Sequence, residues 1–262
     1  MRYVKDGINL TFNLSLLLIM KVTDKILAKI NRIDTGDVFG YDTLGITSDE
    51  LLAASKALGR LVNKGVIKRA RKGYYYKPKS SVFGELKPRE EVLLSIYLFE
   101  KKKQVAYVTG TRLYNRLGLT TQVPNSIRIA SFHKQVKGKI GNMIVKPAKS
   151  YVKVTTENIK YLEILDVIKD LNKIPDFEKS DGIVYLKRTL SKFDNLEIKK
   201  LITYGMAYPP KVRALLGALL EALRIDFSFY NVLKKSINPS SSYKYGINSQ
   251  LLSTATSWKI SK

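Results

Sequence analysis

The spacing of apolar residues predicts three helices near the beginning of the chain. From Val22, apolar side chains recur every three or four positions, which is the spacing of one buried helix face. The glycine-containing break that follows has room for a short strand at Val38-Phe39 and a brief second helix over residues 42–44. The third and longest helix is expected over residues 49–64, where the helical spacing returns.

This third helix is expected to start at a cap formed by Thr47 or Ser48 and to stop at Gly65. Its predicted inward stripe consists of Leu51, Ser55, Leu58 and Val62, with Leu61 beside it. Its predicted outward stripe places small residues between long cations: Ala53, Lys56, Ala57, Arg60, Asn63 and Lys64. Small residues allow a helix to approach a DNA major groove closely, and Lys and Arg reach phosphates and guanine edges.

A basic β-hairpin is predicted directly after the third helix. Residues 66–70 have the composition of a strand, Arg71-Lys72-Gly73 that of a tight turn, and residues 74–77 that of the return strand. Three helices followed by a hairpin form the winged helix-turn-helix, in which the second helix of the pair lies in the groove. Residues 51–84 hold nine Lys or Arg and no Asp or Glu, so this region predicts a DNA-binding domain.

The charge of this region selects six residues as predicted contacts to double-stranded DNA. They are Lys56, Arg60, Lys64, Lys68, Arg71 and Lys72. Arg60 is predicted to reach a base edge, and the Arg71-Lys72 pair at the hairpin tip is predicted to hold phosphates.

Helical and extended patterns alternate in the rest of the chain. Residues 79–87 are polar and contain glycine, which is typical of a linker, and Pro88 suits the first turn of a helix. The elements expected after it are helices over 89–103, 111–117, 156–171, 181–193, 195–204 and 210–223, strands over 105–108 and 127–130, and a hairpin with arms 133–140 and 143–145. The predicted fold class is α+β: a winged helix-turn-helix followed by a mixed α/β domain that ends in a helical region.

This pattern divides the chain into four segments. They are an N-terminal extension (1–20), a winged-helix domain (21–83), an α/β domain (84–224) and a C-terminal extension (225–262). Three alternatives stay open for residues 1–20: sequence upstream of a start at Met20, an ordered extension, or a signal peptide. The C-terminal extension is expected to be a mobile tail or an added strand. The longest apolar run, Leu14 to Met20, is too short to cross a membrane, which takes about 20 residues.

Charge and rare residue types narrow the candidate functions. The 262 residues include 46 Lys and Arg against 22 Asp and Glu, a formal net charge of +24 at pH 7, which favours a polyanionic partner. Cysteine is absent and His133 is the single histidine, so thiolate and multi-histidine metal sites are excluded. We expect His133 at the surface and predict a cytoplasmic protein with no enzyme activity, no catalytic residues, no metal and no cofactor.

The spacing of three residues is compatible with one enzymatic alternative. Asp176 after Pro175, together with Glu197 and Lys199, mimics the residue spacing of a nuclease that binds Mg²⁺ through carboxylates. Asp194 is predicted to cap a helix, however, and this helix would point Glu197 and Lys199 to different sides. The spacing therefore does not predict a metal site.

Several segments of the chain resemble a known family. The most specific is residues 113–124, with the sequence LYNRLGLTTQVP, and it is preceded by Tyr107-Val108-Thr109-Gly110. The run RLVNKG at residues 60–65, the strand at 127–130 with the basic hairpin after it, and the run YPPKVR at residues 208–213 occupy corresponding places. Over residues 21–223 the chain resembles AbiEi-like antitoxins, the transcriptional-regulator component of type IV toxin–antitoxin systems in bacteria.

This resemblance implies a protein with two roles. The N-terminal winged helix would bind operator repeats in its own promoter and repress its own operon. The C-terminal domain would counteract a nucleotidyltransferase-like toxin without forming a stable complex with it. Residues 1–19 and 224–262 depart from the family's usual pattern.

Two other functions stay open from the sequence. The winged helix could serve as a protein-interaction domain, with the positive charge steering acidic partners. The second domain could bind RNA through the cations around its hairpin, namely Lys134, Lys137, Lys139, Lys146 and Lys149. Thr120, Thr121 and Gln122 either bind a ligand or satisfy backbone groups at a buried turn, and the second interpretation is favoured.

Overall fold

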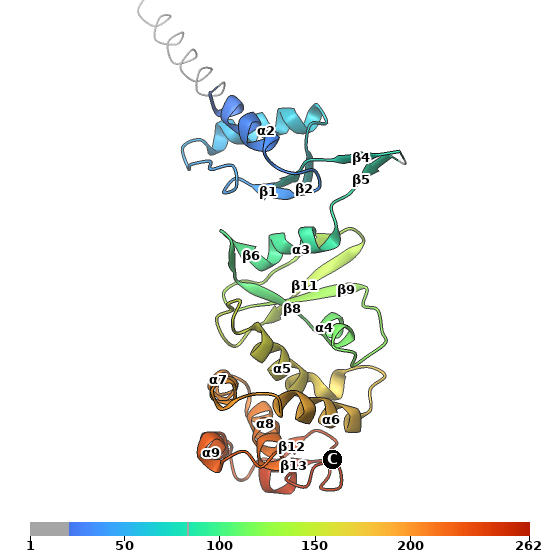
Figure 1. Cartoon of the computed structure of the whole chain (residues 1–262), viewed down its shortest axis with the longest axis vertical. Coiled ribbons are helices and arrows are strands. Elements are labelled where there is room, and N and C mark those ends of the chain that lie inside the picture. Colours follow the sequence, from blue (N-terminus) through green and yellow to red (C-terminus); the bar gives the residue numbers. More distant parts are fainter. Residues whose placement is uncertain (1–20, 83) are drawn as a thin grey trace, which may run out of the picture. The chain divides into compact units, whose positions relative to one another are not determined.

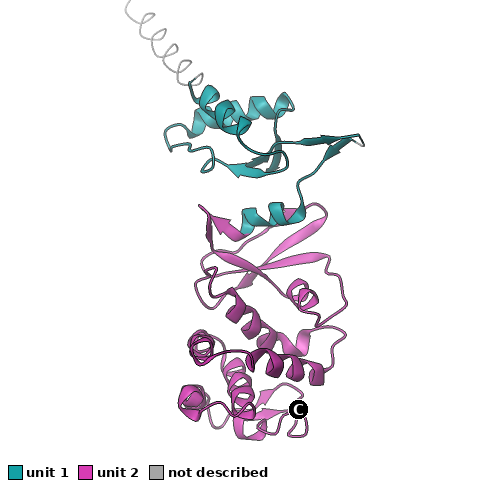
Figure 2. Ribbon diagram, viewed as in Figure 1, with its two compact units in different colours: residues 1–97 teal, residues 98–262 magenta. Residues whose placement is uncertain are grey.

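Helices and small sheets alternate along the chain in the computed structural model, which describes residues 21–82 and 84–262 (Figure 1). The fold is mixed α+β, as predicted. It divides into two units, with the boundary between Tyr97 and Leu98 (Figure 2). We call these unit 1 and unit 2. The predictions for the N-terminal extension lie outside the described residues.

Unit 1 packs two helices against a three-stranded antiparallel sheet. The helices span residues 21–31 and α2 (Leu51–Asn63), and the sheet has the order β1-β3-β2. Its strands are β1 (Val38–Gly40), β2 (Lys68–Arg71) and β3 (Tyr74–Tyr76). The apolar face of the first helix, with Ile26 and Ile30, shares one core with Phe39 of β1, Leu58 of α2 and Tyr75 of β3. The predicted first helix, short strand and hairpin are confirmed.

The predicted second helix over residues 42–44 is wrong. This segment is a turn, in which Leu44 N–H donates to Gly40 O at 3.2 Å and Gly45 N–H donates to Asp42 O at 3.0 Å. Gly45 then takes a positive φ of 62°, which leaves the helical region. A segment of this length fixes too many dihedral angles for too few hydrogen bonds to continue as a helix.

The predicted orientation of α2 is also wrong in part. Ala53 and Ala57 were expected on the outward stripe, but both are buried, in the stripe that also contains Leu58 and Leu61. Leu51 and Ser55 were expected inside, but Leu51 is 44% exposed and Ser55 is also exposed. Burial follows a stripe two residues wide, because the small alanines pack into the core beside the leucines.

The two ends of α2 differ in how well the sequence predicted them. Gly65 ends the helix with φ 72°, as predicted: Gly65 N–H donates to Val62 O and Val66 N–H donates to Leu61 O, each at 3.0 Å. The expected Thr47 or Ser48 cap is absent. Instead, the Glu50 carboxylate accepts a hydrogen bond from Thr47 N–H at 3.1 Å.

The segment expected to be a linker folds as a second hairpin in unit 1. Strands β4 (Lys79–Ser81) and β5 (Gly84–Leu86) pair antiparallel. Helix α3 (Glu90–Leu98) follows and ends earlier than expected. Lys101 and Lys102 have φ values of 45° and 64°, which form the turn between β6 (Phe99–Glu100) and β7 (Lys103–Gln104).

After the β6–β7 hairpin, unit 2 contains a four-stranded sheet of order β10-β11-β9-β8. Strand β11 is parallel to β9, and the other neighbours are antiparallel. The bounds are β8 (Ala106–Thr109), α4 (Thr111–Arg116), β9 (Ser126–Ser131), β10 (Gly138–Ile140) and β11 (Met143–Lys149). The predicted strands and short helix are confirmed, whereas the first arm of the predicted hairpin is a strand only over 138–140 and its second arm continues to Lys149.

Helices form the rest of unit 2, and α5 lies between the sheet and the other helices (Figure 1). The helices are α5 (Ile159–Asp170), η1 (Leu171–Lys173), α6 (Lys179–Leu190), α7 (Asn195–Gly205), α8 (Pro210–Ala222) and α9 (Phe227–Lys235). Asp194 caps α7 in a capping box with Glu197, as predicted for Asp194. None of the helices in the described ranges is long and apolar enough to cross a membrane.

The C-terminal segment belongs to the core of unit 2. After α9 it forms β12 (Tyr243–Lys244), η2 (Thr256–Trp258) and β13 (Ile260–Ser261), with β12 and β13 pairing in parallel. Trp258 is fully buried and donates from Nε1 to Glu221 of α8 at 2.6 Å. A Cβ added at Gly217 would lie 2.1 Å from the Trp258 ring, so α8 needs a glycine where the ring packs. The mobile-tail expectation is therefore wrong.

Candidate functional site

The exposed face of α2 in unit 1 carries cations separated by small or short side chains. This face consists of the exposed residues Leu52, Ser55, Lys56, Arg60 and Asn63, with the half-buried Gly59 between them. A Cβ added at Gly59 would meet nothing within 4 Å, so the surface is open at the middle of the helix. The predicted combination of small residues and long cations is present, but Ser55 and Gly59 supply the small residues instead of Ala53 and Ala57.

The three predicted contact residues at α2 all lie on the surface. Lys56 is exposed on the helix, and Lys64 is exposed at its C-cap. The Arg60 guanidinium donates to Thr23 Oγ1 of the first helix at 3.2 Å. An exposed hydrogen bond of this kind contributes little net stability, so a stronger acceptor can replace it.

The hairpin of β2 and β3 places the other three residues in different surroundings. The Lys68 ammonium forms an ion pair with Glu85 of β5 at 2.6 Å, and this hydrogen bond raises the pKa of Lys68. The Arg71 guanidinium lies over the rings of Tyr74 and Tyr97, 5.2 and 4.7 Å from their centroids. Lys72 is exposed at the turn, which Gly73 completes with a φ of 80°.

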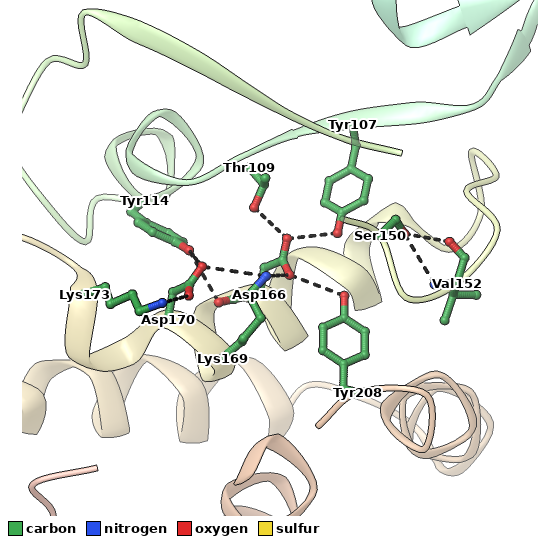
Figure 3. Close-up of polar contacts among 10 residues, drawn as sticks. All are labelled: Tyr107, Thr109, Tyr114, Ser150, Val152, Asp166, Lys169, Asp170, Lys173 and Tyr208. Atoms are coloured by element: carbon green, nitrogen blue, oxygen red, sulfur yellow. Dashed lines mark hydrogen bonds and ion pairs between the residues drawn. The ribbon is translucent and has the colours of Figure 1, made fainter. Parts of the chain in front are cut away.

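A different polar cluster lies inside unit 2, around Asp166 of α5 (Figure 3). Asp166 has no exposed surface, and its carboxylate accepts from Tyr107 Oη at 2.9 Å and Thr109 Oγ1 at 2.6 Å. It also accepts from Tyr208 Oη at 3.4 Å and forms an ion pair with Lys169 at 2.5 Å. Four donors therefore stabilise one buried negative charge.

Asp170 extends this cluster by one turn of α5. Its carboxylate accepts from Tyr114 Oη at 2.9 Å and lies 3.7 and 3.6 Å from the ammonium groups of Lys169 and Lys173. Burial, with the nearby carboxylates as the next cause, raises the pKa of Tyr107 and Tyr114 well above its usual range. Both phenols therefore remain neutral donors. We call Asp166, Asp170 and the side chains bound to them the Asp166 cluster.

Comparison with known proteins places this chain among proteins without an assigned role. Residues 25–181, more than half of the chain, match the model described as "Family of unknown function (DUF6088)". The chain belongs to the DUF6088 family. No curated protein matches it. The DUF6088 match includes the α2 face, both hairpins of unit 1, and Asp166 and Asp170, whereas Tyr208 lies beyond it.

Sequence reasoning missed the Asp166 cluster in this DUF6088 protein. The signal was present: two acidic residues four positions apart interrupt the apolar stripe of the α5 helix. Their partners could not be read from spacing, because Tyr107 and Thr109 stand 59 and 57 residues from Asp166 in the chain. Tyr107, Thr109, Tyr114 and Tyr208 come from β8, α4 and the segment before α8, so these three parts of the chain meet at one place in the fold.

The LGLTTQVP run of the DUF6088 chain has a structural role in unit 2. Gly118 ends α4 with a φ of 72°, and Leu119 N–H donates to Tyr114 O at 2.8 Å. The Asn115 side-chain amide donates to the carbonyls of Thr120 and Gln122, both at 3.2 Å. Thr120 Oγ1 accepts from Gln122 N–H at 3.2 Å. The interpretation favoured from the sequence is therefore confirmed for Thr120, which is buried and satisfies a backbone N–H, whereas Thr121 and Gln122 are exposed and the Gln122 side chain binds Asp176.

The other candidates from the sequence are not gathered into a site. Within the described ranges, no three His, Cys, Asp or Glu side chains are grouped so that they could hold a metal ion. Asp176 accepts from Gln122 Nε2, whereas Glu197 binds Lys160 and the Asp194 backbone. His133 is exposed, as predicted.

Proposed function

We propose that this DUF6088 protein is a DNA-binding transcriptional regulator whose unit 1 is a winged helix-turn-helix. The observation that carries the proposal is the exposed α2 face, on which Lys56 and Arg60 flank Gly59. The element order of a helix, a short strand, a turn, a helix and a hairpin supports it, as does the sheet order β1-β3-β2. In this arrangement α2 is the recognition helix and the β2–β3 hairpin is the wing.

The residues of unit 1 then have separate roles. Arg60 exchanges its exposed hydrogen bond to Thr23 for a base edge or phosphate, because a charged acceptor binds guanidinium more strongly than a hydroxyl does. Lys56, Lys64 and Lys72 are exposed and bind phosphates. Arg71 is held over two tyrosine rings, which limits the side-chain entropy lost when it binds a phosphate.

Lys68 contributes less than the other five in this proposal. Its ammonium is paired with Glu85, so a phosphate must displace a carboxylate to reach it. The pair is exposed enough for this exchange to cost little, since surface ion pairs contribute about 0–1 kcal/mol. Lys68 therefore adds positive charge to the face once a phosphate has displaced Glu85.

We further propose that the protein represses its own operon and acts in the cytoplasm as the antitoxin of a type IV toxin–antitoxin system. This step rests on the resemblance of residues 21–223 to AbiEi-like antitoxins. Its partner is a nucleotidyltransferase-like toxin, with which it forms no stable complex. An RNA-binding hairpin in unit 2 is less favoured, because Lys134 of that set is ion-paired with Glu100.

A gel-shift experiment tests the regulator directly. Full-length protein is incubated with a duplex from upstream of its own gene, with a scrambled duplex of equal length, and with single-stranded RNA. The proposal predicts a shift of the upstream duplex at protein concentrations that leave the other two probes free. Equal binding to all three probes, or preference for the RNA, contradicts it. Binding to none favours the protein-interaction module.

A further inference from the structure

A cationic pocket opens beside the Asp166 cluster in unit 2. Its volume is about 290 Å³, close to the lower limit of small-molecule sites. Five cations line it, namely Arg128, Lys149, Lys169, Lys173 and Lys211. The polar side chains of Thr109, Tyr151 and Asp170 complete the wall. This pocket belongs to unit 2 and is separate from the proposed DNA-binding face of α2.

The positive charge of the pocket is only partly compensated. Among the described residues that line the pocket, Asp170 is the one carboxylate, and Asp166 binds the lining residues Thr109 and Lys169, so five cations are set against two carboxylates. Lys169 and Lys173 are held by these carboxylates. Among the described residues, no carboxylate forms an ion pair with Arg128, Lys149 or Lys211, which leaves three positive charges in excess.

Aromatic rings lie beneath three of the cations that line the pocket. The Lys149 and Lys169 ammonium groups both lie over the Tyr151 ring, 4.9 and 5.8 Å from its centroid. Lys211 lies over the Tyr245 ring at 4.4 Å, and partial burial, followed by the charge of Lys173, lowers the pKa of Lys211. Cations held together in this way repel one another until an anion binds.

We propose that this pocket binds the phosphate group of a small phosphorylated molecule. A terminal phosphate carries nearly two negative charges at pH 7 and offers three acceptor oxygens, which suits an excess of three cations. Arg128 supplies a planar fork for two of these oxygens, and the lysines supply point charges. A phosphodiester carries only one charge, so a nucleic-acid backbone compensates this pocket less well.

Isothermal titration calorimetry of the full-length protein tests the proposal, without DNA and at constant ionic strength in chloride. The titrants are inorganic phosphate, adenosine monophosphate and adenosine. We expect saturable binding of the two phosphates and none of adenosine. Equal affinity for both phosphates identifies the free ion as sufficient, whereas tighter binding of the nucleotide identifies a larger phosphorylated ligand. No saturable binding of either phosphate overturns the proposal.

A pair of double variants assigns the binding to the pocket. Lys149→Ala/Lys211→Ala is expected to weaken phosphate binding at least tenfold, because it removes two of the uncompensated cations. The matched control, Lys192→Ala/Lys200→Ala, removes the same charge from exposed positions of unit 2 that do not line the pocket. Equal affinities of the two variants place the binding elsewhere and contradict the proposal.

Two further measurements keep this result interpretable. The thermal unfolding midpoint without phosphate shows whether each variant folds. Lys173→Ala provides a second test, because 76% of that side chain is exposed and its removal is expected to leave folding intact. It is also expected to weaken phosphate binding. If the pocket variants bind duplex DNA more weakly while the wild type binds neither small phosphate, the pocket serves nucleic acid and the proposal is wrong. Because DNA is absent from the calorimetry, failure of the regulator proposal does not affect it.

Discussion

The two units use positive charge in different ways. In unit 1, Lys56, Lys64 and Lys72 are exposed on α2 and the hairpin, and residues 51–84 contain no Asp or Glu. In unit 2, Lys169 is held by Asp166, a carboxylate with no exposed surface. The same residue type therefore creates an external electrostatic field in unit 1 and compensates a buried charge in unit 2. Exposure, more than composition, decides which role a lysine has.

This comparison predicts opposite costs for substitutions in the two units. Exposed cations that bind a partner are replaceable for folding but not for binding. The buried members of a hydrogen-bonded charge cluster are required for folding, because removing one leaves the others without partners, whereas an exposed member such as Lys173 is replaceable. Four predictions test this difference, from the largest expected effect to the smallest.

The largest effect is expected for Asp166→Ala. It leaves the Tyr107, Thr109 and Tyr208 hydroxyls without this acceptor, and it leaves Lys169 with only the longer ion pair to Asp170 at 3.7 Å. Removing one partner of a buried charge pair costs about 3–5 kcal/mol of unfolding free energy. Urea unfolding measures this loss. The control Asp181→Ala, at an exposed position in the first turn of α6, is expected to cost no more than about 1 kcal/mol. Similar losses for the two variants would remove the distinction.

Arg60→Ala is expected to change DNA recognition and leave folding almost unaffected. If Arg60 contacts a base edge, the variant loses about 1–3 kcal/mol of discrimination between the upstream duplex and one substituted at the contacted base pair. Competition binding with the two duplexes measures this difference. An equal loss of affinity for both duplexes assigns Arg60 to the DNA backbone instead.

Arg71→Ala/Lys72→Ala tests the hairpin tip. Each phosphate contact releases about 0.9 counterion, so the double variant is expected to lower the slope of log affinity against log salt by about 1.8. Affinities measured over a series of salt concentrations give the slope. The variant Lys192→Ala/Lys200→Ala, with the same loss of charge in unit 2, is expected to keep the wild-type slope. An unchanged slope in the hairpin variant removes the wing from the proposed interface.

The smallest effect concerns the pH dependence of stability. Burial lowers the pKa of Lys211 below its ordinary 10.5, so its charge destabilises the folded state at neutral pH. This penalty is present below the folded pKa and disappears as pH rises toward the unfolded pKa. Lys211→Met is therefore expected to increase the free energy of unfolding at pH 7 by less than about 1 kcal/mol. This increase, measured by urea unfolding at several pH values, is expected to shrink as pH rises. A gain that grows with pH contradicts this prediction.

Local patterns in the sequence predicted the elements that local interactions define. The helices α7 and α8 carry regular apolar spacing, and Asp194 and Gly65 mark helix ends through hydrogen bonds to nearby residues. The orientation of α2 was only partly predicted, because alanine occurs both in cores and at surfaces and its position in a sequence does not distinguish the two. Ala53 and Ala57 are buried in this helix. The polar, glycine-containing composition of residues 79–86 predicted a linker, and it did not indicate the hairpin that these residues form.

The interior of unit 2 shows where sequence reasoning stops. Asp166 finds its partners on β8 and just before α8, and Trp258 packs against Gly217 of α8. These contacts join residues far apart in the chain, and helical or strand spacing carries no information about them. By contrast, the absence of Asp and Glu from residues 51–84 can be read directly from the sequence. In agreement with it, five of the six predicted DNA contacts have no carboxylate ion pair among the described residues, and Lys68 is the exception.

The most direct test of the regulator proposal is the affinity of three proteins for the duplex upstream of the gene, measured by fluorescence anisotropy at one salt concentration. They are the wild type, Lys56→Ala/Arg60→Ala on the exposed face of α2, and Lys192→Ala/Lys200→Ala in unit 2. The α2 variant is expected to bind at least tenfold more weakly than the wild type, a loss of roughly 1.4 kcal/mol or more in binding free energy. The control is expected to stay within about twofold of the wild-type affinity. Equal weakening of the two variants would show that net charge alone attracts the duplex, and it would contradict recognition by α2.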